Sequence, residues 1–244
     1  MARFTRHDGR TPSQLRPVTI TPGFIRTATG SCLIEVGGTR VVCTASFVPG
    51  VPKWRAGKGL GWMTAEYGML PASTSQRKDR PIGKADGRSV EIQRIIGRVL
   101  RSAIRLDRLG ENTIYLDCDV LEADGGTRTA AITGSWVALA RAVAALSAKG
   151  LCSPSAVTAP VAAISVGVVN GRAMLDLNYV EDSSAEVDMN VAMTAGGKYV
   201  EIQGSSEARP FDGQALASML SLARRGIRQL HVLQRQAAAK RIRP

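Results

Sequence analysis

The chain has 244 residues, of which 44% are hydrophobic, and its 32 Lys and Arg against 20 Asp and Glu give a formal net charge of +12. This length can bury a large core, while no apolar run approaches the length of a membrane span, so we expect no membrane partner. The strong positive charge favours a polyanionic partner, and nucleic acid is the commonest.

The numbers and positions of the cysteines and histidines argue against several kinds of site. The N-terminus is polar and charged, without the features of a secretory signal, and no two cysteines form a C-x-x-C pair. We therefore expect buried, reduced thiols in a cytoplasmic protein. His7 and His231 lie far apart in the sequence, which argues against a histidine-based zinc site or a Ser-His-Asp triad. The four cysteines are Cys32, Cys43, Cys118 and Cys152.

The first half of the chain opens with strands. A short strand is expected at 18–21, and residues 31–36 and 39–47 predict two more strands, joined at Gly37-Gly38 by a two-residue hairpin. A loop rich in Gly, Pro and Lys follows and contains Trp54 and Trp62, before a further apolar segment at 63–70.

A long polar loop at 71–88 carries Arg77, Lys78 and Arg80. Long loops in compact domains are usually functional or disordered. The loop can be a solvated run of charge, or a basic arm for a nucleic-acid backbone. The net charge of the chain favours the second interpretation.

A helix is predicted after this loop, with an apolar stripe that runs from Ile92 to Leu106. Arg88 lies just before it and Ser89 is a plausible cap, so Arg88 is a candidate phosphate ligand at a helix N-terminus. Arginines recur at steps of four and three on another face; they can be solvated, can pair with acids of another subunit, or can face RNA. These are Arg94, Arg98, Arg101, Arg105 and Arg108.

The central stretch 117–131 joins a strand to a helix. Residues 114–120 alternate as a strand, and an Ala-rich helix is predicted from Thr129 onward. Between them, Gly126, Thr127 and Arg128 offer a close backbone approach, a hydroxyl and a guanidinium beside free N–H groups. The stretch suits a phosphate, although a plain strand-to-helix turn with a solvated arginine fits the same residues.

The second half repeats this organisation. Strands are predicted at 161–169 and 172–180 around Asn170-Gly171, and at 187–193 and 199–203. A helix begins near Gly213 and leads into a basic end. The chain therefore predicts a single α+β or α/β domain over residues 1–244, with pseudo-repeated halves at about 1–150 and 151–235 and a basic tail at 236–244.

An acidic cluster at 181–190 stands out in so basic a chain. Val187, Met189 and Val191 alternate with Glu186, Asp188 and Asn190, which predicts a strand with one core face and one carboxylate face. The carboxylates can hold Mg²⁺, can supply a proton donor, or can pair with arginines elsewhere.

Six stretches together resemble the ribonuclease PH family. They occur in the family's order and cover nearly the whole chain, from about residue 6 to the helix near 230. The stretches are RHDGR at 6–10, LRP at 15–17, TAEYGMLP at 64–71, GRSVEIQR at 87–94, DGGTRT at 124–129 and EDSSAEVDMN at 181–190.

The resemblance implies the ribonuclease PH fold, an α+β fold with duplicated β-α-β halves. It also implies a tRNA nucleotidyltransferase: a phosphorolytic 3′-to-5′ exoribonuclease that trims transfer RNA precursors and other RNA 3′ ends and releases nucleoside diphosphates. Inorganic phosphate would be the cosubstrate and a divalent metal, Mg²⁺, the cofactor. The expected assembly is a homohexamer built as a trimer of dimers.

The resemblance also implies roles for particular residues. Asp182 and Asp188 match the acidic pair near the metal and the scissile bond, so both are catalytic and metal-ligand candidates. We assign the proton donor to Asp188 and the metal to Asp182, although the sequence does not separate the two roles. Phosphate contacts are expected from Arg88, Gly126, Thr127 and Arg128, and RNA contacts from Arg77, Lys78 and Arg80.

Overall fold

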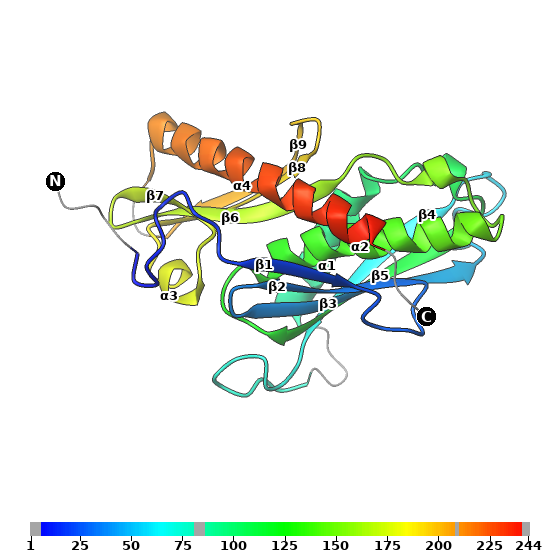
Figure 1. Cartoon of the computed structure of the whole chain (residues 1–244), viewed down its shortest axis with the longest axis horizontal. Helices are drawn as coiled ribbons and strands as arrows, with labels where there is room; N and C mark the ends of the chain where they lie inside the picture. Colours follow the sequence, from blue (N-terminus) through cyan, green and yellow to red (C-terminus); the bar gives the residue numbers. More distant parts are fainter. Residues whose placement is uncertain (1–5, 81–85, 208–209, 241–244) are drawn as a thin grey trace.

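A five-stranded sheet carries most of the first half of the chain. The computed structural model describes residues 6–80, 86–207 and 210–240. The strand order is β1-β2-β3-β5-β4, with β4 and β5 parallel and the other neighbours antiparallel (Figure 1). The strands are β1 (Val18–Pro22), β2 (Gly30–Val36), β3 (Thr39–Pro49), β4 (Trp62–Met69) and β5 (Asn112–Glu122).

A four-stranded antiparallel sheet belongs to the second half. Its order is β7-β6-β8-β9. On β8, Val187, Met189 and Val191 are buried against the last helix, α4, while Asp188 and Asn190 lie on the opposite face, half-buried. The alternation predicted from the sequence is confirmed. The strands are β6 (Val161–Val169), β7 (Arg172–Leu175), β8 (Val187–Thr194) and β9 (Tyr199–Ser206).

The helices include three long ones and one short one. They are α1 (Gly87–Arg101), α2 (Thr127–Ala148), α3 (Tyr179–Asp182) and α4 (Gly213–Ala239), and two 3-10 turns lie at Leu106–Arg108 and Pro154–Ala156. α1 and α2 cover one face of the five-stranded sheet, and α4 lies across β6 and β7 (Figure 1).

α2 lies between the two sheets and belongs to the core of both. Its buried side chains join one hydrophobic cluster with β2, β3 and β5 on one side and with Val161, Ala163 and Ala192 on the other. Polar contacts cross the same region: the amide of Gln234 on α4 donates to the carbonyl oxygens of Thr133 (2.8 Å) and Val161 (2.9 Å). Among the described helices, α2 alone is long and apolar enough to cross a membrane, but 78% of its apolar window is buried inside the protein, as in a core helix.

Three sequence-based boundaries are wrong. α1 ends at Arg101, so Leu106, Arg105 and Arg108 lie outside it. The strand expected to reach residue 180 stops at Leu175, because Asp176 adopts a left-handed φ of 56° and Asn178 then caps α3. α4 continues to Ala239, so the first residues of the expected tail are helical. The described cysteines are all free, with Cys32, Cys43 and Cys118 buried, as predicted.

Candidate phosphate and RNA site

The turn between β5 and α2 is built for close contact. Gly125 and Gly126 both have left-handed φ angles, 74° and 69°, which favour glycine. A Cβ atom on Gly125 would lie 2.7 Å from the carbonyl carbon of Asn178, so only glycine lets the turn press against the segment that leads into α3. Gly126 is the N-cap of α2.

The carbonyl groups of this turn are already hydrogen-bonded, whereas the backbone N–H groups that open α2 find no acceptor in the described parts of the chain. The Thr39 hydroxyl donates to the Gly125 carbonyl at 2.7 Å, and the Arg16 guanidinium donates to the Asp124 carbonyl. The backbone N–H groups of Thr127, Arg128 and Thr129 have no acceptor among the described residues. These free donors and the positive end of the α2 dipole form an anion site.

Side chains from three other elements fix the polar groups of this turn. The Tyr67 hydroxyl on β4 donates to Thr127 Oγ1 at 2.8 Å. Arg128 Nη1 donates to Gln203 Oε1 on β9 at 2.9 Å, and Gln203 Nε2 donates in turn to Glu91 Oε1 on α1, also at 2.9 Å. Arg128 is therefore held in place by β9 and α1 while keeping further N–H donors for a ligand.

Arg88 brings a second guanidinium to the same place. It is exposed in the first turn of α1. The expected Ser89 cap is wrong: the cap is Asp86, whose carboxylate accepts from the Arg88 backbone N–H and from the Ser89 hydroxyl. The positive charges of Arg88 and Arg128 both act on the pKa of Asp182, although burial is the larger influence and raises that pKa overall.

The two aspartates expected from the acidic cluster meet at this site from different elements. Asp182 ends α3, whereas Asp188 lies on β8. Burial and then the negative charge of Asp182 raise the pKa of Asp188 from 3.8 to about 6, and Arg128 opposes this rise. Two partly buried carboxyl groups with raised pKa values near arginines are typical of catalytic sites.

The pair of carboxylates fits a divalent cation. Asp188 Oδ1 is buried and has no hydrogen-bond partner among the described residues, so it can accept a ligand. Within the described ranges, no group of three or more His, Cys, Asp or Glu is arranged to hold a metal. Mg²⁺ commonly takes one or two carboxylates and completes its shell with water and substrate phosphates, and a site formed by Asp182 and Asp188 is compatible with this chemistry.

The basic loop approaches the site at one residue. Lys78 lies near the α1 cap, where its charge contributes to the lowered pKa of Asp86 after the larger effect of the Ser89 hydrogen bond. Arg77 pairs with Asp79 at 2.7 Å, and Arg80 is exposed. The described part of the loop projects from the body of the protein (Figure 1). The loop residues 81–85 lie outside the described ranges.

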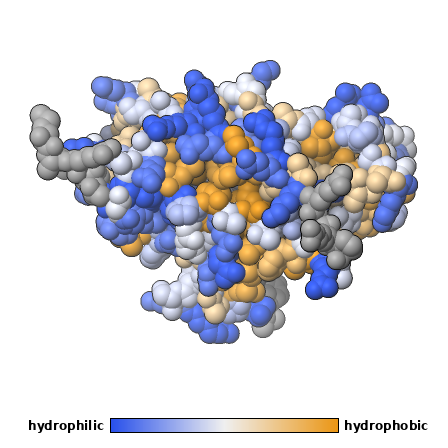
Figure 2. Space-filling view, in the orientation of Figure 1, coloured by the Kyte–Doolittle hydropathy of each residue, from blue (hydrophilic) through white to orange (hydrophobic). Residues whose placement is uncertain are grey.

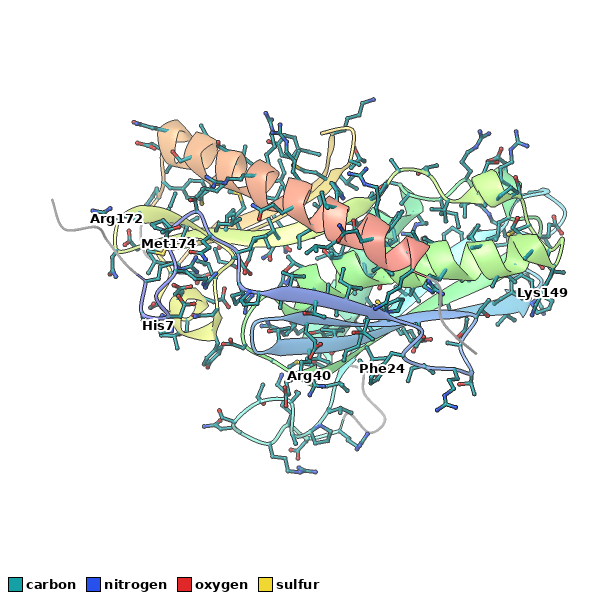
Figure 3. All side chains as sticks on the ribbon, viewed as in Figure 1. His7, Phe24, Arg40, Lys149, Arg172 and Met174 are labelled. Atoms are coloured by element: carbon teal, nitrogen blue, oxygen red, sulfur yellow. The ribbon has the colours of Figure 1, made fainter. Side chains whose placement is uncertain are left out.

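A buried ionic network supports α3 from behind. Arg6 pairs with Glu181, and Arg16 binds the carboxylate of Asp176 through Nη2 at 2.7 Å. Glu181 and Asn178 also form a capping box. Figure 3 shows His7 beside α3, where its ring lies 3.9 Å from Glu181. The N-terminal segment thus fixes the short helix that carries Asp182.

A separate groove of about 930 Å³ lies between residues 8–18 and α4. Figure 2 shows apolar residues gathered on this face. Its charged lining side chains include Asp8, Arg10 and Arg16, which already form ion pairs with one another or with Asp176. The groove is therefore not the catalytic candidate.

Sequence reasoning assigned no role to three residues that shape the site. Tyr67 and Arg16 lie within stretches that carried the family resemblance, and that was the available signal for them. Gln203 gave no such signal, because its contact with Arg128 joins positions 75 residues apart. The charges of Arg88 and Arg128 act on Asp182, and those of Asp182 and Arg128 act on Asp188, so these four residues lie near one another. Arg77 and Arg80 lie on the exposed loop.

Comparisons with known proteins identify the family and the fold. The model of the 3′ exoribonuclease family, domain 1, also labelled RNase PH, matches residues 14–145, and that of domain 2 matches residues 159–226. The structure of an Archaeoglobus fulgidus exosome with RNA bound to the active site aligns with a TM-score of 0.78 and 21% identity over 93% of this chain and 92% of that one.

Two further structures share the fold. Rice (Oryza sativa) Rrp46 aligns with a TM-score of 0.75 and 20% identity over 96% of this chain and all of its own, and an archaeal exosome core chain gives 0.76 and 21% over 95% and 91%. At such identities the structures establish the fold alone, while the family models cover both halves of the sequence. The chain therefore belongs to the 3′ exoribonuclease family of the ribonuclease PH type.

Proposed function

We propose that this protein is a phosphorolytic 3′-to-5′ exoribonuclease that trims the 3′ ends of transfer RNA precursors and releases nucleoside diphosphates. The reverse reaction would add nucleotides to RNA 3′ ends. The observation that carries the proposal is the meeting of two arginines, each in the first turn of a different helix, beside the same carboxylate, Asp182.

The attacking phosphate would occupy the N-terminus of α2. The free N–H groups of residues 127–129 and the guanidiniums of Arg88 and Arg128 supply directed donors and positive charge. Phosphoryl transfer requires mainly positioning and charge neutralisation. Two cations at this point reduce the repulsion between the attacking dianion and the RNA phosphate.

Asp188 is the group best suited to hold the transferred proton. As a phosphate oxygen bonds to the terminal RNA phosphorus, the bond from that phosphorus to the neighbouring ribose 3′-oxygen breaks, and this oxygen needs a proton. A pKa of about 6 keeps the Asp188 carboxyl partly protonated near neutral pH. Asp182 lies closer to the arginines' influence and is assigned to the metal.

Asp182 and Asp188 together would hold the Mg²⁺ ion. When bound, it would neutralise charge on the non-bridging phosphate oxygens. The unpartnered Asp188 Oδ1 is the atom that supports this assignment. A cytoplasmic location and the homohexamer, a trimer of dimers, belong to the same proposal; a closed ring would present several copies of the Arg77, Lys78 and Arg80 loop to one RNA.

A test of the function uses a 3′-extended transfer RNA with and without inorganic phosphate. We expect shortening only with phosphate, and nucleoside 5′-diphosphates as the chromatographic product. Arg128→Ala should lower the efficiency of phosphate use by about ten- to a hundredfold, because a charge-assisted hydrogen bond contributes about 1.5–3 kcal/mol. Arg26→Ala, at an exposed arginine between β1 and β2, is the control. Equal monophosphate release without phosphate would overturn the proposal.

A second candidate is a non-catalytic RNA-binding subunit. It would share the fold of the exosome chains and would bind the same RNA without shortening it. The convergence of both arginines with both aspartates supports the catalytic proposal instead, since binding alone does not call for a carboxyl group with a raised pKa.

A further inference from the structure

The side chain of Gln203 on β9 lies between an acid and an arginine of the phosphate site. Its oxygen accepts from Arg128 Nη1, and its nitrogen donates to Glu91 Oε1, both at 2.9 Å. An amide can serve both neighbours because one end accepts and the other donates. The guanidinium and the carboxylate therefore fix the direction of the amide, since the reversed amide would set donor against donor and acceptor against acceptor.

The position two residues earlier on β9 carries an acid instead of an amide. Side chains two residues apart share one face of a strand, and Glu201 and Gln203 line the same small pocket as Arg128. Glu201 pairs directly with Arg98 of α1 at 2.9 Å. This face of β9 thus holds one arginine by an ion pair and the other, Arg128, by a neutral amide.

The amide leaves the charge of Arg128 uncompensated at direct contact. In the ranges that the structure describes, Arg128 forms no ion pair. A carboxylate in contact with this guanidinium would compete with an anionic ligand for it, whereas a neutral amide does not. Glu91 lies one side chain further away, and its attraction for Arg128 is weaker at the longer distance.

We propose that Gln203 is a positioning residue that aims Arg128 at inorganic phosphate while it keeps the negative charge of Glu91 away from that guanidinium. The amide passes on an orientation set by α1 through hydrogen bonds and carries no charge of its own. The inference rests on the proposed function, because phosphate is the ligand assigned to Arg128. Phosphate affinity then depends on where one negative charge lies, and not only on the hydrogen bonds that hold Arg128.

The test exchanges the two side chains in one double variant, Glu91→Gln with Gln203→Glu. The exchange keeps the net charge of the chain and one amide and one carboxylate in the series, so every hydrogen bond can still form. It places the carboxylate against Arg128. Isothermal titration calorimetry with inorganic phosphate, in buffer without RNA, should show a Kd raised by about ten- to a hundredfold, as for loss of one charge-assisted hydrogen bond to the ligand.

Three single variants separate charge from structure. Glu91→Gln keeps an acceptor for the Gln203 amide and removes the charge, so it should bind phosphate at least as tightly as the unaltered protein. Gln203→Leu removes both hydrogen bonds without adding a charge, and its loss of affinity should be smaller than that of the double variant. Glu201→Gln, which removes the ion-paired acid from the same face of β9, is the matched control and should leave the affinity unchanged. Heat unfolding followed by circular dichroism checks that each variant is folded.

Two outcomes would overturn the inference while phosphate still binds at Arg128. One is a double variant with the affinity of the unaltered protein, which would reduce Gln203 to a structural support. The other is a Glu91→Gln variant that binds phosphate more weakly than the unaltered protein, and this arm decides the matter even if the double variant does not fold.

The proposed function can fail separately, because the calorimetric measurement needs no turnover. If the exchange weakens phosphate binding as expected but the unaltered protein releases no nucleoside diphosphate from RNA, the proposed function falls and the inference stands. If Arg128→Ala binds phosphate as tightly as the unaltered protein, both fall.

Discussion

Glu181 and Asp182 are neighbours on α3 with opposite surroundings. Glu181 is buried and accepts hydrogen bonds from Arg6 and Arg10, and these contacts lower its pKa against the opposing effect of burial, which is the larger single influence. Asp182 is partly buried and accepts no hydrogen bond from an arginine that the structure describes, and burial raises its pKa. Glu181 completes a structural ion-pair network, whereas Asp182 is a partly buried carboxyl group at the candidate site.

The difference shows how the short helix serves two purposes. Arginines from the N-terminal segment saturate Glu181 and hold α3 in place, which stabilises the fold. The arginines near Asp182 approach it without saturating it, so they remain available for phosphate. Removal of the Glu181 carboxylate should therefore lower the stability of the fold, whereas removal of a carboxylate at the site should lower activity.

The largest expected effect is on catalysis by Asp188→Asn. The substitution keeps the shape of the side chain but removes its charge and its acidic proton. If Asp188 is the proton donor, the single-turnover rate should fall by about 10²- to 10⁴-fold, while RNA affinity stays within about twofold. Partial recovery of the rate in a magnesium series would assign Asp188 chiefly to the metal.

Asp119→Asn is the matched control for this substitution. Burial and the charge of Asp117 raise the pKa of Asp119 as well, but it lies on β5, paired with Gly68 on the neighbouring strand. Its rate should match that of the unaltered protein. If Asp188→Asn also had a nearly normal single-turnover rate, Asp188 would be neither the proton donor nor an essential metal ligand.

A large loss of stability is expected for Glu181→Gln. Arg6, 4% exposed, would lose its buried counter-charge, which costs about 3–5 kcal/mol. Because the folded pKa of Glu181 lies below its ordinary 4.5, its contribution is present above pH 4.5 and is lost as the pH falls through the folded value. Urea unfolding at pH 7 and at pH 4 should show the larger deficit at pH 7; equal deficits would contradict the ion-pair account.

A smaller effect of opposite sign is expected for the stability of Asp188→Asn. A folded pKa near 6 against an ordinary 3.8 means that ionised Asp188 destabilises the fold above pH 6, by up to about 3 kcal/mol. In metal-free buffer the variant should therefore unfold at higher temperature than the unaltered protein at pH 7.5, and the gap should close towards pH 4. Equal unfolding temperatures of the two proteins at pH 7.5, measured by calorimetry, would show that Asp188 is more hydrated than its raised pKa implies.

Much of the fold followed from local patterns in the sequence. The alternation in β8, the hairpins around Gly37-Gly38 and Asn170-Gly171, and the helix after Gly126 were all predicted and confirmed. The end of β7 was wrong because tertiary contacts decide it: Arg10 and Arg16 bind Asp176 and stabilise its left-handed backbone. No local pattern reports contacts 160 residues apart.

The site was predictable to the extent that its residues lie in recognisable motifs. Arg88, Arg128, Asp182 and Asp188 were identified, and the structure brings them together. The sequence did not show that Gln203 holds Arg128, or that Asp86 rather than Ser89 caps α1. Both contacts depend on which acceptor side chain lies within hydrogen-bond distance of the donor. That distance follows from packing rather than from spacing along the chain.

The position of α2 between the sheets has a consequence for how the protein folds. The two family segments, 14–145 and 159–226, look separable along the chain, yet each sheet supplies one wall around α2. Gln234 further joins α4, α2 and β6 through its two hydrogen bonds. A fragment that ended after α2 would leave one side of this helix in water, so we expect that neither segment folds on its own. We therefore expect the phosphate turn at the start of α2 to form only when both sheets are in place.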